Sequence, residues 1–274
     1  MRFSEELQIA QSLAVEAAAL IRKAASEGFE CSEKGAGDLV TSADLASDAL
    51  LTTGLMEAFP DDGILTEESG RVGGSGERVW IIDPLDGTRA FARGEPGVCV
   101  HVALHAEGEL QLGVVADPRA RRVAFAVRGQ GAFERDESGD RMRRLQVGSS
   151  TGGTPRLVTS RSMSLSRRDA LLESCGWSKG PRVRGAGYKT LTICRGEGEV
   201  YFSEHPLHVW DTAAPVMIAR EAGAFATAPS GAELRFPLRS GWRHDEGMVI
   251  TAGLDHASAL RSLSEGWSAL EAAG

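Results

Sequence analysis

Apolar residues near the start of the chain recur at the three- and four-residue spacing of an α-helix. They run from residue 7 to residue 24, behind Ser4, a residue type that commonly caps a helix, and acidic residues fill the first turn. This pattern predicts an amphipathic opening helix with Ser4 as its N-cap. A second helix is predicted from the capping-box-like segment 41–44 to residue 59, because Pro60 cannot continue it.

Two short apolar runs, residues 64–65 and 79–82, are rich in branched or bulky side chains and end abruptly in acidic residues. We interpret both as strands that carry carboxylates at their C-terminal ends. From residue 98 to residue 133 apolar and polar positions alternate, and turn-forming residues interrupt the alternation. A period of two of this kind predicts an antiparallel meander.

The polar, glycine-rich stretch 136–155 is typical of a domain junction. The sequence therefore predicts an α+β domain of residues 1–146 and an α/β domain of residues 147–274, in which strands and helices alternate. The elements expected in the second domain are strands at 157–158 and 200–202 and helices at 166–174, around Lys189 and at 211–221.

The 274 residues include 38 acidic and 30 basic side chains, which gives a formal net charge of −8. This balance argues against binding to a nucleic-acid polymer or an anionic membrane, because both are polyanions. The four cysteines lack the spacing of zinc ligands. The sequence has neither a basic and apolar leader nor an apolar run of about 18 residues, so we expect a soluble cytoplasmic protein.

The segment 83–88, Asp-Pro-Leu-Asp-Gly-Thr, carries two carboxylates three residues apart with a proline between them. A continuing strand does not accommodate this arrangement, so we expect a turn. In such a turn Asp83, Asp86 and the Leu85 carbonyl can face one point, and oxygen ligands of this kind bind Mg²⁺. The two residues that follow, Gly87 and Thr88, can offer backbone N–H groups to a phosphate where the chain enters a helix.

The alternative is that these aspartates only cap a turn, as most Asp-Pro and Asp-Gly pairs do. Against it, Glu67, Glu68 and Asp211 also stand at the edges of apolar runs rather than on polar faces. Clustered carboxylates repel one another by about 1 kcal/mol per pair at 4 Å in water, and by more near a protein surface. Bound cations remove that repulsion, which favours a metal site.

Motifs of several other enzyme classes are missing from the sequence. A haloacid-dehalogenase-type nucleophile needs the pattern Asp-x-Asp-x-Thr, and Pro84 occupies the place of its first aspartate. This argues against a covalent aspartyl intermediate. The sequence has no GxSxG, HExxH or Walker A string either.

Three motifs occur in order: residues 66–68 (Thr-Glu-Glu), residues 83–88, and residues 210–214 (Trp-Asp-Thr-Ala-Ala). Together they resemble the lithium-sensitive, Mg²⁺-dependent phosphatase superfamily that includes inositol monophosphatases, fructose-bisphosphatases and 3'(2'),5'-bisphosphate nucleotidases. The resemblance spans essentially the whole chain. It implies a layered αβαβα sandwich, two or three bound Mg²⁺ ions, a small phosphorylated substrate and an active site between the two halves. Relatives are commonly dimeric, so a homodimer is a further expectation.

The resemblance also implies roles for individual residues. Thr88, hydrogen-bonded to Asp44, is expected to act with Glu67 in orienting and deprotonating the attacking water. The phosphate is expected to rest on the backbone of Gly87 and Thr88. The implied metal ligands are Glu67, Asp83, the Leu85 carbonyl, Asp86 and Asp211.

Three segments favour adenosine 3',5'-bisphosphate as the substrate. Residues 89–91, 185–189 and 210–215 look more like those of bisphosphate nucleotidases than like those of inositol monophosphatases. A second phosphate needs a cation once the metals are committed to the first. Arg89 and Lys189 are the candidate cations, with Gly187 beside them.

Glu204 lies seven residues before Asp211, where inositol monophosphatases place a glutamate on the inositol ring. Inositol 1-phosphate is therefore the second candidate, and histidinol phosphate and fructose 1,6-bisphosphate stay open. A non-enzymatic alternative is a protein of the same fold that senses Mg²⁺ or a phosphorylated metabolite. Against it, Asp44, Glu67 and Thr88 are all of the types that catalysis needs.

We expect the tryptophans and histidines near these motifs to have structural roles and not to bind the metal. We assign Trp80 and Trp210 to the core that holds the carboxylates. His205 and His208 are assigned to packing or the surface, because a site of hard oxygen ligands has little use for imidazole.

Overall fold

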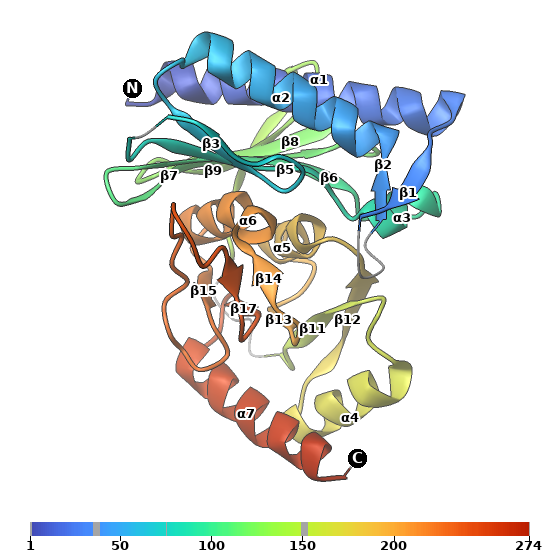
Figure 1. Cartoon of the computed structure of the whole chain (residues 1–274). Coiled ribbons are helices and arrows are strands. Elements are labelled where there is room, and N and C mark those ends of the chain that lie inside the picture. Colours follow the sequence, from blue (N-terminus) through green and yellow to red (C-terminus); the bar gives the residue numbers. More distant parts are fainter. Residues whose placement is uncertain (1, 35–38, 75, 149–152, 274) are drawn as a thin grey trace.

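The computed structural model describes residues 2–34, 39–74, 76–148 and 153–273, with side chains up to residue 268. Five layers follow one another in Figure 1: a helix pair, a large sheet, a second helix pair, a smaller sheet and a third helix pair. This order confirms the predicted αβαβα sandwich. None of the described helices combines the length and the apolar character needed to cross a membrane.

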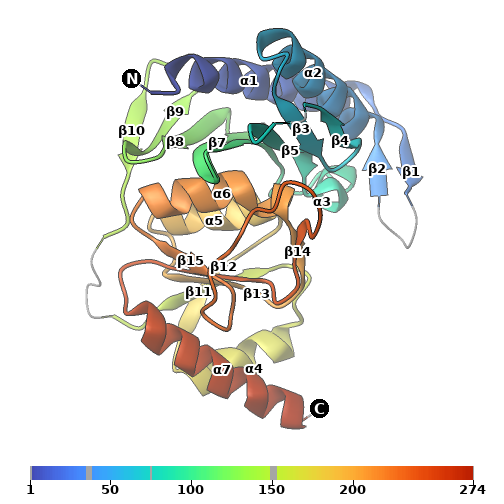
Figure 2. The ribbon, with the colours of Figure 1, turned by 60° about the vertical axis from the view of Figure 1, so that its left-hand side comes forward.

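The first helix pair consists of α1 (Ser4–Glu27) and α2 (Ser42–Ala58), which lie together on the outer face of the large sheet (Figure 2). The core side of α1 is built from small residues, Ala10, Ala14, Ala17 and Ala18, all fully buried. Small side chains let the helix approach its neighbours closely, and the apolar area they remove from water stabilises the layer.

The start of α2 follows the prediction and the start of α1 does not. At α2, the Asp44 side chain accepts the Thr41 N–H at 2.9 Å, while the Thr41 hydroxyl accepts the Asp44 N–H at 3.4 Å. This is the predicted capping box. The expected N-cap Ser4 is instead the first residue of α1, and Phe3 precedes it in the left-handed conformation (φ 58°) without a side-chain cap.

Eight strands form the larger sheet in the order β10-β9-β8-β7-β6-β5-β3-β4. Strands β6 to β9 are successive antiparallel neighbours, which confirms the predicted meander, whereas β3 and β5 pair in parallel. The strands are β3 (Gly63–Thr66), β4 (Gly70–Gly73), β5 (Val79–Asp86), β6 (Cys99–Ala106), β7 (Glu109–Asp117), β8 (Arg122–Val127), β9 (Gly131–Asp136) and β10 (Met142–Leu145). A separate hairpin joins β1 (Cys31–Glu33) and β2 (Leu39–Thr41).

Strand β5 corrects the prediction of a turn at residues 83–86. Asp83 pairs with His101 of β6, and Asp86 pairs with Cys99, so three steps along β5 match two along β6. The strand therefore continues through Pro84 as a β-bulge, which bends it and re-aims its side chains. A bulge accepts proline because the ladder hydrogen bond is already interrupted there.

The smaller sheet has the order β12-β11-β13-β17-β15. Helices α5 (Ala186–Cys194) and α6 (Val209–Glu221) lie between the two sheets, and α4 (Leu165–Cys175) and α7 (His256–Ala273) cover the far side (Figure 1). Helix α7 was not predicted from the sequence, and α6 begins two residues before its predicted start. The strands are β11 (Arg156–Ser160), β12 (Ser178–Val183), β13 (Val200–Ser203), β15 (Phe225–Thr227) and β17 (Met248–Thr251), with a small pair β14 (Leu207–His208) and β16 (Arg243–His244).

All strands of the larger sheet end by residue 145, and the smaller sheet begins at residue 156. We propose that the division at 146/147 separates two structural halves, each with its own sheet. The predicted junction 136–155 lies between them, although β10 occupies part of it and residues 149–152 lie outside the described residues.

A buried ion-pair network joins the larger sheet to α5. Glu134 of β9 is almost fully buried, and its Oε1 accepts hydrogen bonds from Nε and Nη2 of Arg195, at 2.9 and 2.6 Å, at the end of α5. Its Oε2 accepts a bond from Arg143 Nε at 2.9 Å. Burial alone would raise the pKa of Glu134, but the two arginines hold it below its usual value.

We expect Glu134→Ala to lower the free energy of unfolding by about 3–5 kcal/mol, because the Arg195 guanidinium is then left buried and unpaired. Glu109→Ala is the matched control: its partner Arg128 is half-exposed, so the loss should stay below about 1 kcal/mol. Urea midpoints of the two variants measure the difference. Equal shifts would contradict a role of the Glu134 network in joining the halves.

Candidate active site

Three carboxylates from distant parts of the chain converge at the edge between the two halves. Glu67 follows β3, Asp83 lies on the bulged part of β5, and Asp211 lies in the first turn of α6. One carboxylate oxygen of each lies within 4.8 Å of the others. The prediction that acidic residues from both halves meet is thus fulfilled by the geometry.

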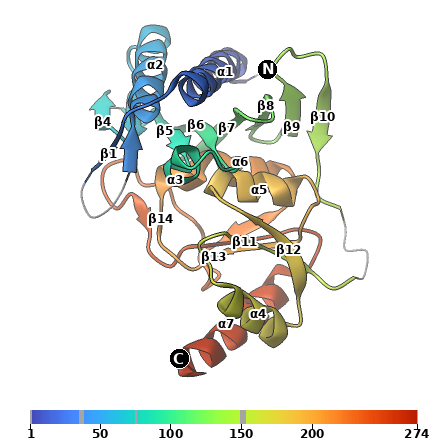
Figure 3. The same cartoon turned by 90° about the vertical axis from the view of Figure 1, so that its right-hand side faces the viewer.

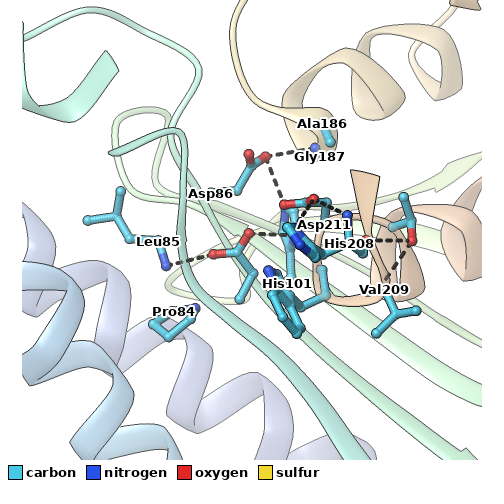
Figure 4. Close-up of polar contacts among 12 residues, drawn as sticks. Pro84, Leu85, Asp86, His101, Ala186, Gly187, His208, Val209 and Asp211 are labelled. Carbon is cyan, nitrogen blue, oxygen red and sulfur yellow. Dashed lines mark hydrogen bonds and ion pairs between the residues drawn. The ribbon is translucent and has the colours of Figure 1, made fainter. Parts of the chain in front are cut away.

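Each aspartate is oriented by a specific backbone contact. Asp83 Oδ1 accepts the Leu85 N–H at 3.0 Å, and Asp211 Oδ2 accepts the His208 N–H at 2.6 Å (Figure 4). Asp86 Oδ2 accepts the N–H of Gly187, at the start of α5, at 2.8 Å. The bulge on β5 and the N-termini of α5 and α6 therefore fix the carboxylates together.

The pKa values of these groups record how unfavourable their negative charges are without a cation. Burial, together with the charges of Glu67, Asp86 and Asp211, raises the pKa of Asp83 well above its usual value. Burial and the charges of Asp86 and Glu67 raise the pKa of Asp211 to about 7. For Asp86, burial is outweighed by His101, the Gly187 N–H and Lys189, so its pKa is lowered.

The donor set suits a hard divalent cation. It consists of carboxylate oxygens, the ligand type that Mg²⁺ prefers. Among the residues that the structure describes, Asp83 Oδ2 is buried and accepts no hydrogen bond, although a carboxylate oxygen in such surroundings needs a donor or a cation. The ligand roles of Glu67, Asp83, Asp86, Asp211 and the Leu85 carbonyl stay predictions, of which the geometry brings together the carboxylates of Glu67, Asp83 and Asp211.

The predicted hydrogen bond between Thr88 and Asp44 is present. Thr88 Oγ1 donates to Asp44 Oδ1 at 2.8 Å, and Asp44 is held in turn by the α2 capping box. Thr88 opens the short helix α3 (Thr88–Ala92), which follows directly after β5 (Figure 3). Gly87, at φ 93°, precedes it, and a Cβ there would lie 2.6 Å from the Gly97 carbonyl oxygen, so only glycine fits.

Lys34, from the β1–β2 hairpin, is a contact that the sequence analysis missed. Its Nζ lies 2.8 Å from Glu67 Oε1 and 2.5 Å from Glu68 Oε1. Burial would lower the pKa of Lys34, but the hydrogen bonds and charges of both glutamates more than offset that and raise it. A lysine in a polar segment gives no sequence signal of a partner more than thirty residues away.

A pocket of about 360 Å³ opens beside the carboxylates. Trp210 and His208 stack in its wall, with ring centroids 4.6 Å apart and planes 11° apart. Trp210 thus packs against the core, as predicted, and also lines the site. The other lining residues are Leu39, Glu67, Gly87, Thr88, Arg89, Ala90, Ser160, Ser162, Arg184, Gly185 and Asp211.

Three predicted substrate contacts are not among the residues that line this pocket. Gly187 instead donates its N–H to Asp86. Lys189 is buried, with its Nζ 4.8 Å from the centre of the Tyr201 ring, and it acts on the site only through its charge near Asp86. Glu204 pairs with Arg167 at 3.0 Å and lines a different cavity. Arg89 does line the pocket, and Arg184, which the sequence analysis missed, joins it.

Comparison with known proteins places this site in a family. The model of the "Inositol monophosphatase family" matches residues 3–265. The chain is 33% identical over 250 residues to human inositol monophosphatase 2, which covers 85% of this chain and 83% of the relative. It is 32% identical over 245 residues to an inositol-1-monophosphatase of Rhizobium meliloti, with 86% of each chain covered.

Solved structures agree with the sequence relatives. The extragenic suppressor protein suhB from Bartonella henselae superposes with a TM-score of 0.81 at 25% identity, covering 96% of this chain and 100% of that one. Proteins of this family are Mg²⁺-dependent phosphatases that hydrolyse phosphate monoesters. With its acidic cluster, its layered fold and a match along nearly its whole length, the chain belongs to the inositol monophosphatase family.

Proposed function

We propose that the chain hydrolyses a small phosphorylated metabolite with a metal-activated water at the Glu67, Asp83 and Asp211 cluster. The observation that carries this proposal is the convergence of these carboxylates within 4.8 Å beside an open pocket. Bound Mg²⁺ supplies charge neutralisation for the phosphoryl group and acidifies a coordinated water. The enzymatic class follows from the family, and the alternative of a pure sensor finds no separate support.

The residues around the cluster have two proposed roles, metal binding and activation of the attacking water. We assign Glu67, Asp83, the Leu85 carbonyl, Asp86 and Asp211 to holding the metal. Thr88, whose hydroxyl donates to Asp44, shares the pocket with Glu67, and this pair would orient the attacking water and take up its proton.

The phosphate itself would rest at the start of α3. The first N–H groups of a helix have no acceptor within the helix, and the residues at the start of α3, Gly87 and Thr88, line the pocket. Phosphoryl transfer depends mainly on such positioning and on charge neutralisation, so the site needs no covalent nucleophile.

For the substrate we propose a phosphomonoester with a second anionic group, adenosine 3',5'-bisphosphate first among the candidates. Two arginines, Arg89 and Arg184, line the pocket, and Arg184 is held there by Glu95, which accepts its Nε–H at 2.6 Å. Inositol 1-phosphate is the second candidate. The names of the relatives support it, whereas the position of Glu204 outside the pocket does not.

We expect Asp83→Asn to reduce phosphate release at least about a hundredfold, since a direct ligand should matter more than the outer partners whose loss costs 10–100-fold. The control Asp169→Asn removes a half-exposed carboxylate paired with Lys179 and should keep full activity. Phosphate release in the presence of Mg²⁺ measures the activity of both variants, and circular dichroism shows whether they are folded. A folded Asp83→Asn enzyme with normal turnover would refute the assignment.

Without metal, stability should fall as the pH rises. An unfolded Asp211 ionises near its usual 3.8, whereas the folded one ionises near about 7, so the folded state holds an extra proton between these values. The contribution of Asp211 to the free energy of unfolding is fully present below the unfolded-state pKa. It declines by up to about 1.4 kcal/mol per pH unit between the unfolded-state pKa and the folded-state pKa. Urea midpoints in EDTA measure this slope.

Two further measurements separate this slope from general pH effects. Saturating Mg²⁺ should flatten it, because the cation stabilises the ionised carboxylates. Asp211→Asn should reduce the slope in EDTA, whereas Asp245→Asn, at an exposed ion pair with Arg243, should leave it intact. An unchanged slope in Asp211→Asn would show that another group controls it.

Arg184→Gln should lower kcat/KM for adenosine 3',5'-bisphosphate by about 10–100-fold, the value of one charge-assisted hydrogen bond. The same change should alter kcat/KM for inositol 1-phosphate little, because that substrate has no second phosphate. A wild-type preference for inositol 1-phosphate, with Arg184→Gln affecting both substrates alike, would favour the second candidate.

A further inference from the structure

His101 is a buried histidine in the centre of the site, and no predicted role uses it. It lies on β6 directly opposite Asp83 and is fully buried. Figure 4 shows it beside Asp86 and close to the start of α5. The ring Nε2 lies 3.4 Å from Asp86 Oδ2, and Nδ1 lies 3.9 Å from Asp83 Oδ2.

The hydrogen bond of the ring leads to the other half of the molecule. His101 Nδ1 lies 3.2 Å from the carbonyl oxygen of Trp210, in the first turn of α6. A carbonyl oxygen only accepts, so Nδ1 carries the hydrogen and donates it. The peptide group that accepts this bond is the one joining Trp210 to Asp211. His101 lies on the same sheet as Asp83, and its imidazole therefore holds the backbone next to Asp211, which faces Asp83 from the other half.

The first turn of α6 needs such support from outside the helix. Pro215 lies inside α6, and because proline has no N–H, the Asp211 carbonyl loses its usual helical donor four residues on. The turn that bears Asp211 is thus one hydrogen bond short. Contacts from other elements hold neighbouring groups of the same turn: His101 donates to the Trp210 carbonyl, and the His244 ring bonds Thr212 Oγ1 at 3.0 Å.

The space around His101 is also closely fitted. A Cβ added at Gly187 would lie 2.1 Å from His101 Nε2, so the start of α5 packs directly on the ring. Nε2 itself has no hydrogen-bond partner among the residues described. The ring is therefore held in place by close packing against Gly187 and by the bond of Nδ1.

We propose that His101 is a positioning residue for the metal site, holding the first turn of α6 so that Asp211 meets Asp83 and Glu67. The inference rests on the proposed ligand role of Asp211. Outer partners of metal ligands commonly contribute 10–100-fold to metal affinity by fixing ligand orientation. Loss of the Nδ1 bond should therefore weaken Mg²⁺ binding, and higher Mg²⁺ concentrations should restore much of the lost turnover.

Two conservative variants isolate the bond. In His101→Asn the amide nitrogen can take the place of Nδ1 and donate to Trp210, whereas in His101→Gln the amide reaches the place of Nε2 instead. We expect the Gln variant to bind Mg²⁺ about 10–100-fold more weakly and the Asn variant to stay within about threefold of the wild type. Isothermal titration of the metal-free protein with Mg²⁺ measures both, whether or not a substrate is known.

His105→Gln is the matched control. His105 is another buried histidine on the same strand, paired with Val79 at the far end of β5. This variant should lose stability, measured as a urea midpoint, but keep wild-type Mg²⁺ affinity. If His101→Gln does not fold, His101→Ser, which also cannot reach Trp210, takes its place.

Three outcomes would overturn the proposal. Equal Mg²⁺ affinities in the Asn and Gln variants would show that the Nδ1 bond does not matter, and wild-type affinity in both would show that His101 only fills space. A loss restricted to KM for substrate at saturating Mg²⁺ would assign His101 to the pocket instead. The Mg²⁺ affinities do not depend on which phosphomonoester is hydrolysed, so failure of this inference stays distinguishable from failure of the proposed substrate.

Discussion

The mutual repulsion of carboxylates gathered in one partly buried place is the constraint on which this site depends. Glu67, Asp83 and Asp211 bring oxygens within 4.8 Å of one another. At such distances two like charges repel by about 1 kcal/mol in water and by several-fold more near a protein surface. The fold maintains this arrangement with bonds from the backbone and leaves the charge to be neutralised by cations.

The layered architecture explains why the site lies where it does. Helices α5 and α6 lie between the two sheets (Figure 1), and residues at the start of each helix meet carboxylates on the bulged end of β5. Helix N-termini carry a partial positive charge and unpaired N–H groups, which favour anions. The far end of α5 is fixed by the buried pair of Arg195 and Glu134, so the helix is attached to the larger sheet at both ends.

Local features of the fold and site could be predicted from the sequence, whereas features that depend on contacts between distant residues could not. The α2 capping box, the meander and the Thr88 bond to Asp44 were all predictable, because short-range spacing or a family motif specifies them. The bulge in β5 was mistaken for a turn, since proline is compatible with both and only the register against β6 distinguishes them. Lys34 and His101 reach the site from other elements, a proximity that spacing does not encode.

The two lysines near the site offset the charge of some carboxylates and not of others. Lys34 pairs with Glu67 and Glu68, and Lys189 contributes a positive charge near Asp86, whose pKa is lowered. Asp83 and Asp211 have raised pKa values, so for them burial and repulsion outweigh the support that they receive. These two belong to different halves of the chain. A cation held by both would neutralise the least favourable charges and, because it would bind both halves at once, would also stabilise their contact.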